Sequence, residues 1–92
     1  MATLLQLLNA AEQSIWKTDG EDQAKNAYRF TRSVGPSLQV EELSSQLLSD
    51  FLADISSRRS PATHNRYRSA IVSLLGVAQK RQWLDRLPCV PP

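Results

Sequence analysis

The longest regular pattern of apolar and polar positions lies between Ser60 and Gln82. Ser60 is a suitable N-cap because its hydroxyl can accept a hydrogen bond from a free amide of the first turn, and Pro61 is tolerated at the first helical position. The apolar residues that follow recur at helical spacing and predict one buried face: Tyr67, Ile71, Leu74, Leu75 and Ala78. The stretch therefore predicts a helix that packs one face into a core.

The face opposite Ile71 is small, polar and basic. It carries Ala62, Asn65, Arg66, Ser69, Ser73, Gly76 and Lys80. Serine, asparagine and arginine can donate hydrogen bonds to phosphates and to base edges, so this face is suited to nucleic acid. An ordinary solvent-exposed helix face is the alternative, and this helix alone leaves both open.

Two helices are expected in the first third of the chain. The first begins at the capping residue Thr3 and runs to about Lys17. Its apolar stripe consists of Leu4, Leu8, Ala11 and Ile15, widened by Leu5, Leu7 and Trp16. This stripe is expected to face the core; the alternative is that it binds a helix of a partner protein. The second helix begins near Asp19 and runs to about Val34, where Gly35 ends it. Its expected buried side is formed by Ala24, Ala27, Tyr28, Thr31 and Val34.

A third helix is expected over residues 45–57, after a short extended segment around Leu38 and Val40. Leu43 and Leu48 have the spacing of a hydrophobic staple at its start. Its expected buried residues are Leu47, Leu48, Phe51, Leu52 and Ile55. Its outward face is acidic, with Gln46, Asp50 and Asp54, and is expected to lie away from any nucleic acid.

The length of 92 residues fits one domain with a modest core. Trp83, Leu84 and Leu87 are expected to fold back onto the bundle, which gives a domain over residues 1–87 and the start of a proline-rich linker at 88–92. The chain has one cysteine, which excludes an internal disulfide, and no apolar run long enough to span a membrane. These features predict a soluble, cytoplasmic protein.

Charge is divided unevenly along the chain. Residues 1–54 contain four basic and eight acidic residues, a net charge of −4, whereas residues 55–92 contain seven basic and one acidic, a net charge of +6. Lys25, Arg29 and Arg32 recur at helical spacing and form a second cationic stripe. A solvated face is again the alternative, but two cationic helix faces together suggest a polyanionic partner.

Catalytic and cofactor chemistry is not evident in the sequence. His64 is the one histidine, no cluster of cysteine and histidine has metal-ligand spacing, and no glycine-rich loop could hold a nucleotide phosphate. Tyr28 and Tyr67 fall on expected apolar faces and are assigned to the core. We therefore expect neither an enzyme nor a cofactor.

The beginning and end of the last helical stretch resemble the core-binding domain of tyrosine recombinases, the phage-integrase family. The matching residues are Ser60, Thr63, Asn65, Arg66, Ser69, Ala70, Ala78, Trp83, Leu84 and Pro88. Residues 40–51 look like the family's segment leading into its third helix, and residues 28–35 fit its second helix and glycine stop. Leu87 departs from the asparagine that is usual in the family before the terminal proline.

The resemblance implies an all-α, SAM-like four-helix bundle. Such a bundle precedes a catalytic domain of the same parent chain and clamps duplex DNA with it, together with other recombinase protomers. The resemblance also implies DNA-binding roles for two residues of the second helix, Lys25 and Arg29, and for four of the fourth, Thr63, Asn65, Arg66 and Ser69. Charge and the side of the helix on which they lie add three further candidates: Arg32, Arg59 and Lys80. The expected function is binding of a recombination core site, with cleavage left to the catalytic domain. A helical protein-interaction module is the alternative.

Overall fold

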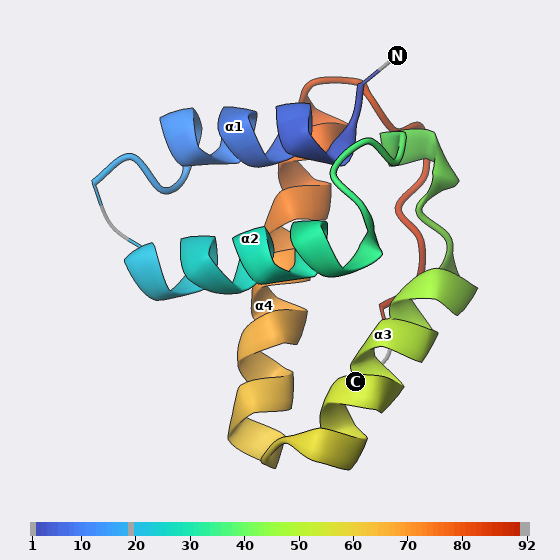
Figure 1. Cartoon of the computed structure of the whole chain (residues 1–92). Coiled ribbons are helices and arrows are strands. Elements are labelled where there is room, and N and C mark those ends of the chain that lie inside the picture. The colour runs from blue at the N-terminus through green and yellow to red at the C-terminus, as the bar shows by residue number, and fades with distance from the viewer. Residues whose placement is uncertain (1, 19, 91–92) are drawn as a thin grey trace.

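The computed structural model describes residues 2–18 and 20–90, which form four α-helices (Figure 1). In chain order these are α1 (Leu4–Ser14), α2 (Glu21–Val34), α3 (Ser45–Arg58) and α4 (Pro61–Lys80), with the 3-10 turn η1 (Val40–Glu42) before α3. No strand occurs in the two described ranges, and one isolated bridge joins Thr3 to Gln39. The all-helical class and the four helices predicted from the sequence are confirmed.

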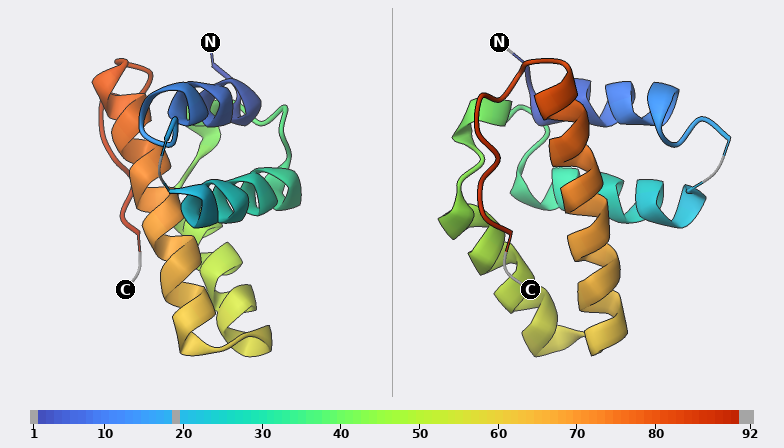
Figure 2. Two further views of the ribbon diagram at one scale, coloured as in Figure 1. Left: turned by 90° about the vertical axis from the view of Figure 1, so that its left-hand side faces the viewer. Right: turned by 180° about the vertical axis from the view of Figure 1, so that it is seen from behind.

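Helix α4 is the element around which the others are arranged. It packs against each of the other three helices, and its most extensive contact is with α2. Helices α1 and α2 run side by side and cross α4, whereas α3 and α4 form a hairpin that opens away from their short connection (Figures 1 and 2). Two elements far apart in sequence, α2 and α4, are thereby brought together.

Aromatic contacts link three helices in the core. The Phe30 ring of α2 meets the Phe51 ring of α3 edge to face, with centroids 5.0 Å apart, and Phe51 meets the Tyr67 ring of α4 at 5.5 Å. The apolar face predicted for α4 is buried at every position: Tyr67, Ile71, Leu74, Leu75 and Ala78. The predicted face of α3 is also confirmed, since Leu48, Leu52 and Ile55 are buried and Leu47 and Phe51 pack against the core.

The starts of α1 and α4 follow the capping residues read from the sequence. Thr3 and Gln6 form a reciprocal capping box at α1. Ser44 caps α3, and Ser60 caps α4 by accepting a hydrogen bond from the Thr63 amide at 3.3 Å. These side chains satisfy backbone donors that an uncapped helix would leave without a partner.

The end of α1 differs from its prediction. The helix stops at Ser14 rather than at about Lys17, because the chain turns there and buries the indole of Trp16 instead of continuing along the helix axis. The indole N–H donates to Oε1 of Gln23 at 2.9 Å. Ile15, expected in the buried stripe, lies on this turn and is 45% exposed. Leu5 is 46% exposed on the outer side of α1, whereas the rest of the stripe is buried: Leu4, Leu7, Leu8, Ala11 and Trp16.

The turn before α2 requires a glycine. Gly20 has φ +84°, in the left-handed region, and a Cβ added to it would lie 2.5 Å from Cδ1 of Trp16. Gly20 therefore occupies the N-cap position of α2, whose first turn carries Glu21 and Asp22. The start expected near Asp19 falls on a residue outside the described ranges.

The buried side of α2 is rotated relative to its prediction. Ala27 and Thr31 are buried as expected, but so are Phe30 and Asn26, which were not assigned to the core. Tyr28, which was, is 46% exposed. The reason is that α2 contacts α1 on one side and α4 on the other, so the face toward α4 is covered and the side bearing Tyr28 is left open to solvent.

The segment after α4 folds back as predicted. Residues 81–90 form no helix and return alongside α3 (Figure 2), where the Cys89 amide donates to Oγ of Ser45 at 2.9 Å. Trp83 and Leu84 pack against the core, but Leu87 is exposed, contrary to expectation, because this irregular segment turns it away from the helices. Among the described helices none is both long and apolar enough to cross a membrane.

Candidate nucleic-acid interface

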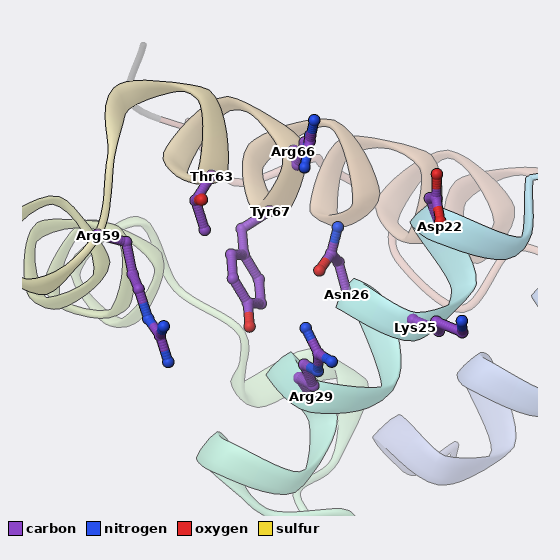
Figure 3. A pocket seen from close by; sticks show the side chains of 8 residues that line it. All are labelled: Asp22, Lys25, Asn26, Arg29, Arg59, Thr63, Arg66 and Tyr67. Carbon is purple, nitrogen blue, oxygen red and sulfur yellow. The ribbon is translucent and has the colours of Figure 1, made fainter.

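The contact between α2 and α4 leaves a groove of about 630 Å³ on the surface (Figure 3). Its walls come from α2, from the start of α4 and from Arg59, in the short connection between α3 and α4. The lining residues are Asp22, Lys25, Asn26, Arg29, Arg59, Thr63, Arg66 and Tyr67. Five of these were predicted as DNA-binding residues: Lys25, Arg29, Arg59, Thr63 and Arg66. The packing of α2 across α4 therefore brings both predicted cationic stripes to one concave surface.

Three guanidinium groups in the groove have no anionic partner. The side chains of Arg29, Arg59 and Arg66 are exposed and make no hydrogen bond or ion pair to any other described residue. Unpaired cations of this kind produce a positive potential that attracts anions, and a concave wall concentrates that field.

Lys25 is less available. Its ammonium lies 3.7 Å from a carboxylate oxygen of Glu21, and Figure 3 shows its side chain extending away from the centre of the groove. Both side chains of this pair are largely exposed, so the pair contributes little to stability. An approaching phosphate could displace the carboxylate at small cost.

Asn65 and Ser69 extend the interface along α4. They line a shallow hollow of about 340 Å³ together with Arg66. This hollow adjoins the groove, since Asp22, Asn26 and Arg66 line both. The first part of the small, polar face of α4 therefore continues the cationic surface.

Arg32 and Lys80 lie outside this surface. The Arg32 guanidinium donates a hydrogen bond to the Tyr28 hydroxyl at 3.0 Å and lies 5.7 Å from the centre of that ring. This hydrogen bond raises the pKa of Arg32 above its ordinary value. Lys80 lines a separate hollow with Trp16 and Gly76, toward the other end of α4. The structure brings the other seven predicted residues together and leaves these two apart.

The acidic face of α3 is exposed, as predicted, and lies in another part of the surface. Asp50 and Asp54 line a hollow formed with the end of α2, and Asp54 accepts a hydrogen bond from Arg58 at 2.6 Å. None of the residues of this hollow lines the cationic groove. The two charged surfaces are therefore separate.

Three groove residues were not predicted as part of the site. Asp22 places one carboxylate at the groove. Asn26 and Tyr67 form the deeper part, and each is only 9% exposed. Tyr67 was assigned to the core, which is correct for its ring but not for its hydroxyl, which reaches the groove. The available signal for Asn26 was a polar residue directly before Ala27 on the buried side of α2.

Within the described ranges, no three histidine, cysteine, aspartate or glutamate side chains are grouped closely enough to hold a metal ion. His64 is half-buried near the start of α4.

Comparisons of the chain with family models, with curated proteins and with solved structures give no match.

Proposed function

We propose that the chain binds duplex DNA through the α2–α4 groove and the adjoining outer face of α4. The observation that carries this proposal is the convergence on one concave surface of Arg29, Arg59 and Arg66, which have no anionic partner within residues 2–18 and 20–90. Arginine is suited to phosphate because its planar guanidinium can donate two parallel hydrogen bonds. Binding is mainly electrostatic: each neutralised phosphate releases condensed counterions, which makes the affinity depend on salt.

Exposed residues on α4 add the capacity for base contacts. Asn65 and Arg66 are exposed one turn into the helix, and both residue types make hydrogen bonds to base edges in the major groove. Ser69, beside Asn65, and Thr63, which lines the groove, add further hydroxyl groups. The start of α4 then enters the major groove while α2 follows the phosphate backbone.

The resemblance to recombinases gives this DNA binding a specific context. We infer a SAM-like core-binding domain of a tyrosine recombinase, in which the helices equivalent to α2 and α4 face the recombination site. Cleavage and strand exchange then belong to a catalytic domain of the same parent chain, and this domain contributes affinity and position. Two linked DNA-binding modules bind more tightly than either one alone.

The alternative of a protein-interaction module places one partner on the leucine-rich face of the first helix and an acidic partner on the basic face; the structure bears on the first of these contacts. Leu4, Leu7 and Leu8 are buried in the core of the domain itself, so they are not available to a partner helix in this fold. DNA binding is therefore the function that the exposed chemistry supports better.

Duplex binding and its salt dependence test the proposal. The domain is titrated into a fluorescently labelled duplex at 50 and 200 mM salt and followed by anisotropy. We expect saturable binding at the lower salt that weakens strongly at the higher, with a slope of log K against log salt of about −0.9 for each phosphate contacted. An absence of binding at 50 mM salt and protein concentrations near 10⁻⁴ M, where even non-specific binding is expected, would contradict it.

A further inference from the structure

Asn26 is a buried polar residue whose side chain points into the α2–α4 groove. It is 9% exposed and forms part of the groove lining from the α2 side. Figure 3 shows its carboxamide, the Tyr67 ring and the Arg29 guanidinium around one space. Two neutral donors and one cation therefore meet where the groove is deepest.

The polar groups of Asn26 and Tyr67 lack partners among the residues that the structure describes. Neither side chain makes a hydrogen bond to any described residue. No fully enclosed side-chain nitrogen or oxygen in the described ranges lacks a hydrogen-bond partner, so these groups must open into the groove rather than into the core. Buried polar groups are nearly always hydrogen-bonded, because leaving one without a partner costs free energy. The recess therefore presents an amide and a hydroxyl that solvent or a ligand atom can reach, and both groups can donate hydrogen bonds.

The depth of the recess distinguishes a phosphate from a base as that ligand. Base edges lie at the bottom of a major groove about 8.5 Å deep, so only a side chain that projects from the protein can reach them. Asn26 and Tyr67 do not project, since both are nine-tenths buried. Phosphates are on the outside of the duplex and can enter a recess in the protein.

The surrounding charge also favours a phosphate. Arg29 lies beside the recess, and Arg59 and Arg66 line the same groove. The carboxylate of Asp22 lines the groove as well, but Figure 3 shows it toward the start of α2, apart from the Tyr67 hydroxyl. Asparagine and tyrosine side chains are among the common donors to DNA phosphates.

We propose that Asn26, Tyr67 and Arg29 form a seat for one phosphodiester group of the DNA backbone. This inference rests on the proposed DNA-binding function and deepens it, because it assigns the buried donors to a single phosphate and leaves base contacts to the projecting residues of α4. The seat fixes the register of the domain on one backbone strand. The ligand class is a phosphodiester, and no base identity is read there.

The test combines a protein substitution with a chemical change in the DNA. Asn26→Asp keeps the side-chain shape, removes the donor and adds a negative charge, so we expect at least about a tenfold loss of duplex affinity from the wild type. Asn9→Asp, on an exposed position of α1, is the matched control with the same change in charge. Both proteins are then measured on duplexes in which one phosphate at a time is replaced by a neutral methylphosphonate.

At one position of this scan, we expect the affinity difference between the wild type and Asn26→Asp to shrink to about threefold or less, because the phosphate that the carboxylate repels is no longer charged. Tyr67→Phe keeps the ring contact with Phe51, removes the hydroxyl and should show the same position dependence. This second variant keeps the test informative should Asn26→Asp fail to fold, which circular dichroism will show.

The outcomes separate the seat from the function. If the wild type binds the duplex but the difference from Asn26→Asp and from Tyr67→Phe is the same at every methylphosphonate position, the phosphate seat is wrong and DNA binding stands. If the wild type does not bind duplex DNA, the proposed function is wrong. The seat is then judged with dimethyl phosphate, which should shift the Asn26 side-chain amide signals in NMR spectra; unchanged signals would overturn it too.

Discussion

Replacing Arg29 and Arg66 together by alanine is expected to lower the affinity for duplex DNA by at least about tenfold at low salt. The two guanidinium groups come from opposite walls of the α2–α4 groove and have no anionic partner among the described residues, so both are available to phosphates. Loss of two phosphate contacts should also reduce the slope of log K against log salt by about two. Fluorescence anisotropy at several salt concentrations measures both quantities.

The control for this pair removes the same charge elsewhere. Arg58 is paired with Asp54 on α3, and Arg86 lies in the segment after α4; neither lines the groove. Arg58→Ala with Arg86→Ala should therefore leave affinity within about threefold, because screening by salt weakens the influence of distant charges. Equal losses in the two double variants would mean that net charge, and not the groove, determines binding.

Phe30→Ala is expected to destabilise the domain by roughly 3–5 kcal/mol. Phe30 is almost fully buried, and its ring contacts Phe51 of α3, which in turn contacts Tyr67 of α4, so Phe30 is the α2 end of a row of rings that links the three helices. A domain of this size has a free energy of unfolding near the lower end of roughly 5–15 kcal/mol, so the variant should be partly unfolded at 37 °C. Urea denaturation followed by circular dichroism measures the loss.

Tyr28→Ala is the matched control for Phe30→Ala, since it removes an aromatic ring from the same helix. Tyr28 is half-exposed, and its hydroxyl accepts a hydrogen bond from the exposed Arg32 side chain. The free energy of unfolding should change by no more than about 1 kcal/mol. A larger loss for Tyr28→Ala than for Phe30→Ala would show that α2 is rotated as the sequence pattern first suggested, with Tyr28 in the core.

The fold was predictable where local chemistry alone determines the structure. The five apolar residues assigned to the core from the sequence of α4 all fall on one side of the helix, so its buried face follows from spacing alone. Thr3, Ser44 and Ser60 cap helices because their hydroxyls act on amides within three residues, without help from distant parts of the chain.

Errors arose where a distant contact decides the outcome. The end of α1 depends on the indole of Trp16 reaching Gln23, seven residues later and beyond the turn. On α2, Tyr28 and Phe30 fit alternative apolar faces, and the choice between them depends on where α1 and α4 pack. Spacing within one helix cannot supply that information.

The candidate site was predictable in part for the same reason. Lys25, Arg29, Asn65 and Arg66 could be selected as two cationic faces, because each face belongs to one helix. Their convergence on a single groove requires the crossing of α2 and α4, which the sequence does not specify locally. The recessed donor Asn26 was missed because its one signal, a polar residue next to Ala27, does not show whether the side chain borders a groove or packs in the core.

The most direct test of the central claim is an NMR titration of the ¹⁵N-labelled domain with a short duplex at low and at high salt. We predict salt-sensitive amide shifts over residues 25–29 and 59–69, because these two segments line the groove and the adjoining hollow. The acidic face of α3 should show little change. Shifts concentrated on residues 46–54, or none at DNA concentrations near 10⁻⁴ M and low salt, would contradict the assignment of the α2–α4 groove as a DNA-binding surface.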